Sequence, residues 1–364
     1  MGSKSRQLHI FFFPLMAHGH LIPTMDMAKL FAERGVKATI VTTPRNVPTF
    51  SKTRGTNVDI QIIKFPAVEA GLPEGCENID SVTSEDMSDK FIKATKMLQQ
   101  PLEQLLEEYQ PSCLVADIFF PWATDVAANF GIPRLVFGIT SFFSLSSQHS
   151  LQQYEPHKKV FSDSEPFVIP SFPGEIKLTR MQLPDFYLQE VETDFYKLLK
   201  EAMESEFTSY GVVVNSFYEL EPAYADHYRK VLGIKAWHIG PVSLCNKDAE
   251  DKAQRGKEAS IDEHECLKWL STMKLNSVIY ICFGSMPNFS DSQLSELAMG
   301  LEASEQQFIW VREAIEKAMR QILVGEEAAR AKALGEMAKR AVEEGGSSCS
   351  DLNALIEELR LHCP

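Results

Sequence analysis

The stretch LHIFFFPLMAHGHLIPTMDMAKLFAERG, residues 8–35, contains a complete strand–turn–helix unit. Residues 8–13 are a short apolar run, which is typical of a strand buried on both faces. From about residue 20 to 34 apolar side chains recur at helical spacing, and Gly35 follows where the helix should end. A strand that leads directly into a helix predicts a parallel sheet, because parallel strands are joined by crossovers of this kind.

The same alternation continues through the first half of the chain. It predicts strands at 37–43, 59–65, 112–116, 134–138 and 210–214, and helices at about 85–109, 121–130, 142–153, 191–208 and 219–231. Apolar strands that alternate with helices favour an α/β fold, with a doubly wound parallel sheet covered on both faces. Residues 154–190 contain five prolines and predict a long surface loop.

The second half is poor in strands. Residues 243–262 are polar and mixed in charge, which indicates a linker between a first domain at 1–242 and a second at 263–364. The second domain offers strands at 277–283 and 307–311, followed only by helices at 313–324, 326–344 and 350–361. A doubly wound sheet needs five or six strands, so this half is either a small appendage or lacks a segment.

The stretch QFIWVREAIEKAM, residues 307–319, marks the place where a segment would be missing. An apolar strand passes into an amphipathic helix with no Gly, Pro, Asn, Asp or Ser between them. Connections usually carry such turn residues, so the junction near residue 312 predicts an internal loss.

Composition narrows the class of protein. A net charge of −14 and the absence of a basic cluster argue against a nucleic-acid partner. The seven cysteines lie in no CxxC or metal-ligand spacing, which indicates reduced thiols in the cytoplasm and no metal site. Residues 1–17 resemble a signal peptide in outline, but His9 and Pro14 interrupt the apolar run and a buried first strand is favoured. No apolar run is long enough to span a membrane.

Two strand ends carry the chemistry. His20, beside Gly19, stands near the start of the first helix, where a helix N-terminus disfavours the imidazolium and so favours a neutral base. His18 is its rival, and a polar surface turn is the alternative. Asp117 follows the strand at 112–116, where it either caps the next helix or orients His20 and balances its charge.

Two further groups of residues could bind a ligand. Gly284 and Ser285 follow the strand at 277–283 and allow close approach of the backbone to a phosphate, although an ordinary tight turn explains them equally well. Aromatic side chains could line an apolar pocket or simply belong to the core; they are Phe119, Phe120, Phe142, Phe143, Phe186 and Tyr187.

Taken together, these stretches resemble the plant UDP-sugar-dependent glycosyltransferases of the GT-B fold, which glycosylate small secondary metabolites. The resemblance rests on FFPLMAHGHLIPTMDMAKLFAERG, LVADIFFPWATDVAANFGIPRLVFGITSFF, GVVVNSFYELEPAYADHYRK, AWHIGPVSLC and SVIYICFGSMPNFSDSQLSELAMGLEASEQQFIWVR. These stretches cover residues 8–312 almost continuously, and the closing helices also resemble the family.

The resemblance implies a reaction and roles for single residues. His20 matches the general base that deprotonates an acceptor hydroxyl, and Asp117 matches the carboxylate that orients it. The hydroxyl then attacks the anomeric carbon of a UDP-sugar, most simply UDP-glucose, with inversion. Thr140 and Ser285, with Gly284, match donor contacts. Gly19, Phe119, Phe120, Phe142 and Phe186 then fall on the side of a phenolic or terpenoid acceptor. A cytoplasmic monomer without a cofactor is expected.

One departure from the family is large. The family's signature box, with its Trp-Ala-Pro-Gln start and His-Cys-Gly-Trp-Asn-Ser core, binds the nucleotide and the sugar. None of Trp122, Trp237, Trp269 and Trp310 heads such a box. The chain therefore resembles a family member whose donor box was deleted near residue 312. It is expected to be either an enzyme with impaired or lost activity or a non-catalytic isoform that binds an acceptor or a partner.

Overall fold

The computed structural model describes residues 7–51, 57–188, 193–247, 268–274, 277–282, 290–303, 307–311 and 326–362. These residues form two compact units. The first consists of Met1–Asp248 with Ala338–Pro364, and the second of Ala249–Met337. The helix α14 (Glu326–Val342) contains the boundary between them.

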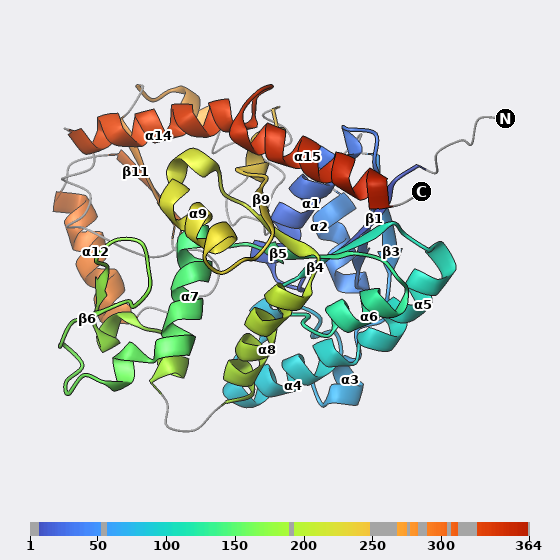
Figure 1. The fold of residues 1–364 in the computed structure, drawn as a ribbon. Helices are drawn as coiled ribbons and strands as arrows, with labels where there is room; N and C mark the ends of the chain where they lie inside the picture. Colours follow the sequence, from blue (N-terminus) through green and yellow to red (C-terminus); the bar gives the residue numbers. More distant parts are fainter. Residues whose placement is uncertain are drawn as a thin grey trace. The chain divides into compact units, whose positions relative to one another are not determined.

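The first unit is built on a seven-stranded parallel sheet with the order β3-β2-β1-β4-β5-β8-β9 (Figure 1). The strands are β1 (His9–Phe13), β2 (Lys37–Thr42), β3 (Val58–Ile62), β4 (Cys113–Asp117), β5 (Arg134–Gly138), β8 (Gly211–Val214) and β9 (Ala236–His238). The predicted strands of the first half are confirmed. The short strand β9 was not predicted, because three residues are too few to show a period.

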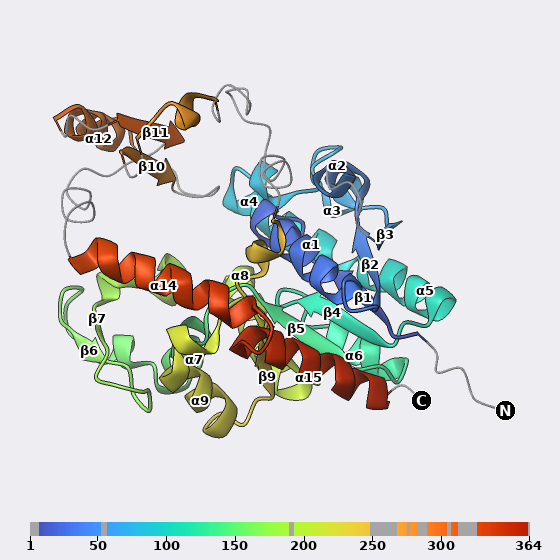
Figure 2. The same ribbon diagram turned by 90° about the horizontal axis from the view of Figure 1, so that it is seen from above.

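One face of this sheet is covered by α1 (His18–Ala32) and α15 (Ser347–His362) (Figure 2). Ile10 and Phe12 of β1 point to this face and pack with Phe31 of α1. After α1 the chain turns at Gly35, whose φ of +76° is the left-handed conformation that glycine adopts without strain. The predicted helix at 20–34 is thus confirmed, with its start two residues earlier.

The other face carries two clusters of helices. The first cluster covers β1 and β4, with α3 (Ala67–Ala70), α4 (Glu85–Lys96), α5 (Gln99–Tyr109) and α6 (Ala123–Asn129). The second covers β5, β8 and β9, with α7 (Phe142–Tyr154), α8 (Asp194–Thr208) and α9 (Pro222–Lys230). A short helix, α2 (Val47–Ser51), follows β2. The expectation of a sheet covered on both faces is confirmed.

The predicted helix at 85–109 is two helices. Pro101 lies in the first turn of α5 and has no N–H to bond the carbonyl of Met97, so α4 ends at Lys96. The region 154–190 is largely irregular, as predicted, except for a small antiparallel pair, β6 (Phe167–Val168) with β7 (Lys177–Leu178).

The last helix differs from the expected domain division. Residues 263–364 were expected to form one domain, but α15 belongs to the first unit. Its apolar stripe is buried in the same core as β1, and it consists of Leu352, Leu355, Ile356 and Leu359. The helical pattern of α15 was predicted correctly, but such a pattern does not say which surface the stripe will cover.

Within the second unit, β10 (Val278–Cys282) and β11 (Gln307–Val311) pair in parallel, and α12 (Asp291–Ala303) connects them. These elements were predicted at 277–283, 307–311 and 290–303. The junction after Val311 and the helix expected at 313–324 lie outside the described residues.

Candidate active site

His20 lies in the first turn of α1, just beyond the carboxyl end of β1. It is 9% exposed, and its Nδ1 is 2.6 Å from Oδ2 of Asp117. Because β1 and β4 are parallel neighbours, their carboxyl ends meet at one edge of the sheet and bring these two side chains together. The two residues predicted to form a pair are therefore in contact.

Asp117 ends β4, and its side chain is fully buried. Its Oδ2 also accepts a hydrogen bond from the Leu15 N–H at 3.3 Å, and its Oδ1 accepts one from the Phe119 N–H at 3.1 Å. The carboxylate thus fixes its own turn and the β1–α1 loop. The alternative in which Asp117 caps the next helix is not realised, since α6 begins after Trp122.

Arg134, the first residue of β5, lies behind Asp117 and is 2% exposed. Its guanidinium donates to the main-chain oxygen of Asp117 at 3.0 Å, to Oγ1 of Thr124 at 2.5 Å and to Oγ of Ser205 at 3.0 Å. Burial lowers the pKa of Arg134 to about 10, against the opposing effect of nearby carboxylates. A cation therefore stands behind the strand end that presents the carboxylate. Sequence analysis had not singled out this residue.

The pKa of His20 is raised. Burial lowers it, but the charge of Asp117, the hydrogen bond to that carboxylate and the charge of Asp80 together outweigh burial. The expectation of a neutral imidazole had considered only the helix N-terminus, and the neighbouring carboxylates reverse the direction. An imidazole with this environment binds a proton readily and remains charge-compensated when it does.

His18, the rival of His20, has a carboxylate of its own. Its Nδ1 is 2.5 Å from Oδ2 of Asp80, which lies in the 3₁₀ turn η2 (Ile79–Ser81). Between the two histidines Gly19 is exposed, with nothing within 4 Å of the position a Cβ would take. The first turn of α1 therefore presents open space flanked by two imidazole–carboxylate pairs.

The aromatic candidates divide into two groups. The ring of Phe119 is 5.8 Å from that of His20, and through Phe195, which sequence analysis missed, it is linked to Phe186 with centroid separations of 6.0 and 5.4 Å. Phe120 and Phe142 are fully buried in the two core clusters on this face of the sheet. The half-buried chain of three rings can line a pocket, whereas the other two phenylalanines are core residues.

The donor-side candidates are only partly visible. Thr140 is exposed and follows β5, one residue before Ser141, which caps α7. It lies in the loop after a carboxyl strand end, where a ligand of this sheet would bind. Gly284 and Ser285 lie outside the described residues.

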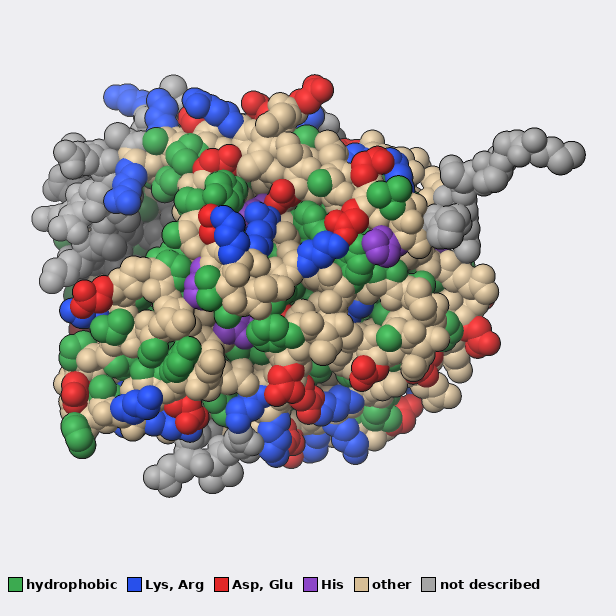
Figure 3. Space-filling view, in the orientation of Figure 1, with side chains coloured by type: hydrophobic (Ala, Val, Ile, Leu, Met, Phe, Trp, Pro, Cys, Tyr) green, Lys and Arg blue, Asp and Glu red, His purple; other side chains and the backbone are tan. Residues whose placement is uncertain are grey.

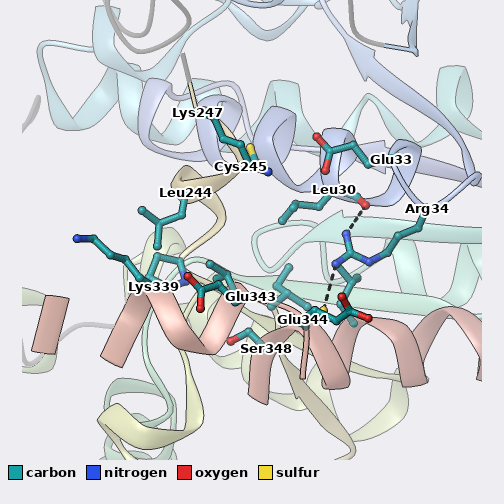
Figure 4. Close-up of a pocket in the computed structure, with 15 residues that line it drawn as sticks. Leu30, Glu33, Arg34, Leu244, Cys245, Lys247, Lys339, Glu343, Glu344 and Ser348 are labelled. Atoms are coloured by element: carbon teal, nitrogen blue, oxygen red, sulfur yellow. Dashed lines mark hydrogen bonds between the residues drawn. The ribbon is translucent and has the colours of Figure 1, made fainter. Parts of the chain in front are cut away.

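A cavity of about 540 Å³ lies at the opposite end of α1 (Figure 4). Leu30 lines it from α1, Arg34 from the turn after that helix, Cys245 from the 3₁₀ turn after β9, and Cys349 from α15. Twelve residues of helix separate Leu30 from His18, or roughly 18 Å at 1.5 Å per residue. This cavity is therefore separate from the His20 site.

Charged side chains of both signs lie on the surface of the part of the chain that the structure describes (Figure 3). Basic and acidic side chains are interspersed on the face that Figure 3 shows. Among the described residues, no group of three His, Cys, Asp or Glu side chains could hold a metal ion. In the described part of the chain, every helix is too short or too polar to cross a membrane.

No family model matches this chain, but it is similar to many known proteins and solved structures. Scopoletin glucosyltransferase of Nicotiana tabacum is 59% identical over 311 residues, which is 84% of this chain and 65% of that protein. UDP-glucose flavonoid 3-O-glucosyltransferase 7 of Fragaria ananassa is 45% identical over 478 residues, and the match covers 99% of this chain and 98% of that protein. The crystal structure of Glycyrrhiza uralensis UGT73P12 with glycyrrhetinic acid 3-O-monoglucuronide superposes with a TM-score of 0.86 at 31% identity, covering 98% of this chain and 96% of that one.

The lengths of these proteins differ from that of this chain. The chain spans 65% of the tobacco protein. The match to the strawberry protein extends over 478 positions, whereas this chain has 364 residues, so at least 114 of those positions lack a counterpart here. The α/β fold of GT-B type that was predicted from the sequence is confirmed by the superposition on solved structures.

Proposed function

This chain belongs to the plant UDP-glycosyltransferase family, and from that membership we propose that its site serves to transfer a hexose from a UDP-sugar to a hydroxyl of a small apolar metabolite. Glucose is the sugar we expect. We further propose that the activity of this particular chain is impaired or lost, because part of the donor site is missing. The observation that carries the proposed chemistry is the hydrogen bond between His20 and Asp117.

In the proposed reaction His20 is the general base. Asp117 occupies Nδ1, which leaves Nε2 to take the proton of the acceptor hydroxyl. The oxygen attacks the anomeric carbon, the bond to the diphosphate breaks, UDP leaves and the configuration inverts. The imidazolium is stabilised by Asp117 until it releases its proton to water.

The aromatic chain next to His20 supports a flat apolar acceptor. Phe119, Phe195 and Phe186 follow one another away from the imidazole, and aromatic rings of this kind stack on planar ligands. The name of the tobacco relative mentions scopoletin, a coumarin, and the name of the strawberry relative mentions a flavonoid. Both are phenols with flat aromatic ring systems. We therefore propose a phenolic acceptor, with a terpenoid as the alternative.

On the donor side we propose that Thr140, Gly284 and Ser285 contact the UDP-sugar, and that the family's donor box is the segment lost near residue 312. Binding energy from the nucleotide helps to drive displacement at the sugar, so its loss lowers the rate as well as the affinity. We propose no cofactor beyond the co-substrate. We also propose a cytoplasmic monomer; Cys76, Cys113, Cys245 and Cys349, whose side chains the structure describes, form no disulfide with one another, as is usual in a reducing compartment.

The length difference favours a second candidate function. A chain that retains the acceptor side but lacks at least 114 positions of its relative can bind an acceptor or a partner without turning over a sugar. This candidate shares the acceptor site with the first and differs from it only at the donor.

Three measurements on the purified chain separate the two candidates. Fluorescence titration with scopoletin measures acceptor binding, calorimetry with UDP-glucose measures donor binding, and chromatography of the mixture measures transfer. Scopoletin binding that is weakened by His20→Ala, together with weak donor binding and slow transfer, supports an impaired enzyme, whereas scopoletin binding without donor binding or transfer supports the second candidate. Micromolar donor binding with rapid transfer contradicts the impairment, and absence of scopoletin binding contradicts the acceptor site.

A further inference from the structure

Two imidazole–carboxylate pairs share the first turn of α1. In both pairs Nδ1 of a histidine meets Oδ2 of an aspartate, at 2.5 Å for His18–Asp80 and 2.6 Å for His20–Asp117. The side chain of Asp80 is only 7% exposed, while that of His18 is 24% exposed. The second pair is therefore a half-buried contact at the edge of the proposed active site, and the reaction described above does not use it.

Asp80 is held in place from its own side of the contact. The Ile79 N–H donates to the main-chain oxygen of Met16 at 2.8 Å, which ties η2 to the loop between β1 and α1. The Asp80 N–H donates to Oδ1 of Asn78, and Nδ2 of Asn78 donates to Oδ1 of Asn46, both at 2.9 Å. A rigidly anchored carboxylate can fix a side chain at the start of α1.

The charge of Asp80 also reaches His20. The carboxylates that act on His20 are Asp117 at the end of β4 and Asp80 in η2, and both oppose the effect of burial on its pKa. Farther along the Asp80 loop, Glu77 accepts a hydrogen bond from the Arg45 N–H, and the Arg45 guanidinium lies against Gly75. His18 contacts Asp80 directly.

We propose that Asp80 is a positioning residue for His20: it holds the first turn of α1 through His18, and its negative charge favours a proton on the neighbouring imidazole. This inference rests on the proposed role of His20 as the base. It assigns to η2, a loop element remote in sequence, a share in setting the basicity of the site.

The test uses two variants that break the same hydrogen bond but differ in their effect on the carboxylate. Asp80→Asn removes the carboxylate, whereas His18→Ala leaves it in place. Asp86→Asn is the matched control, because Asp86 is 73% exposed and pairs with Lys90 on α4. The readout is the pKa of His20 from an NMR titration of the full chain, with its resonance assigned by His20→Ala.

We expect Asp80→Asn to lower the pKa of His20 by about 0.5, the size of a screened charge interaction. His18→Ala and the control should both leave the pKa of His20 unchanged. If Asp80 only held the first turn of α1 in place through its hydrogen bond to His18, both variants would change the pKa of His20 in the same direction or not at all. That result overturns the proposal. If Asp80→Asn fails to fold, a lower pKa of His20 in His18→Ala alone contradicts the proposal.

The titration needs no substrate, so its outcome is independent of whether the chain binds scopoletin or transfers a sugar. Suppose that the chain binds no acceptor, but that the pKa of His20 falls in Asp80→Asn and not in His18→Ala. This result contradicts the proposed function and supports the charge coupling. A chain that binds acceptor but shows equal effects of both variants supports the proposed function and overturns the inference about Asp80.

Discussion

The guanidinium of Arg134 donates a hydrogen bond to the main-chain oxygen of Asp117 at 3.0 Å, so a buried cation holds the strand end that presents the proposed orienting carboxylate. Burying such a group is costly unless its donors are satisfied. The terminal nitrogens of Arg134 have partners on β4, α6 and α8, which ties the site to both helical clusters on that face of the sheet, whereas its buried Nε has no hydrogen-bond partner in the described structure.

Replacing Arg134 by Met should lower the free energy of unfolding by about 3 kcal/mol, because it leaves three buried acceptors without their donor. Urea denaturation followed by circular dichroism measures this change. Arg360, which is 44% exposed and pairs with Glu357, is the matched control, and Arg360→Met should change stability by less than about 0.5 kcal/mol. Equal effects of the two replacements would contradict the structural role of Arg134.

The Asp117→Asn variant should lower the pKa of His20. The carboxylate is the largest of the contributions that raise this pKa, and without it the effect of burial gains weight. The NMR titration used for Asp80 measures the change directly.

In a preparation with detectable transfer, the Asp117→Asn variant should reduce the rate by at least about 100-fold, the usual contribution of general base catalysis. Asp226→Asn, at an exposed pair with Lys230 on α9, is the control for a change in net charge. An unchanged pKa in Asp117→Asn would show that the hydrogen bond does not set the basicity of His20.

The pH dependence of stability follows from the raised pKa of His20. Because the folded chain holds this proton more tightly than the unfolded chain, protonation of His20 stabilises the fold. The contribution is fully present below the ordinary pKa of 6.5 and is lost as the pH rises through the higher value of the folded state. The difference in unfolding free energy between the natural chain and His20→Gln should therefore become smaller as the pH rises above 6.5.

Any transfer by the natural chain should increase over the same pH range, because only the neutral imidazole accepts the proton of the acceptor. A rate that falls as the pH rises above 6.5 would be inconsistent with His20 as the base.

Phe195→Ala should weaken scopoletin binding about fivefold, the equivalent of one aromatic contact of roughly 1 kcal/mol. Fluorescence titration of the two chains gives the ratio of dissociation constants. Phe161 is 98% exposed, so Phe161→Ala removes an aromatic ring of the same size away from the core and should leave binding unchanged. If both variants bind like the natural chain, the acceptor does not use the row of rings that begins at Phe119.

Leu355→Ala should lower the free energy of unfolding of the first unit by about 3 kcal/mol, as large-to-small changes in a core do. Leu355 is fully buried by its packing against the sheet, whereas Leu361 on the same helix is 84% exposed. The matched variant Leu361→Ala should have almost no effect in the same denaturation experiment. Similar stabilities for the two variants would show that α15 is not part of this core.

The sequence predicted most of the sheet because nearly all of its strands are buried on both faces and so appear as apolar runs, with the half-buried edge strand β3 as the exception. His20 and Asp117 were predictable for a related reason: each follows such a run, and parallel neighbours bring their carboxyl ends together. The family resemblance then supplied their proposed roles.

Other features depend on tertiary contacts that no local pattern records. Asp80 meets His18 across 62 residues through an ordinary loop, and Phe195 is one of three aromatic residues in α8. The helix at 350–361 was expected in the second domain, but α15 belongs to the first unit, since an amphipathic stripe identifies a buried face but not its partner. Gly284, Ser285 and the junction after Val311 remain sequence-based predictions.

The placement of α15 has a consequence for biosynthesis. The first unit is discontinuous, since Met1–Asp248 and Ala338–Pro364 enclose the second unit in the chain. Its core lacks the stripe from Leu352 to Leu359 until α15 has been synthesised after the second unit, so one face of the sheet stays partly uncovered while the second unit is made. An in-frame loss between the two segments spares this core, whereas a premature stop codon removes the helix that completes it. Among altered transcripts of this gene, those that keep the reading frame are therefore the ones whose products can still assemble the acceptor half.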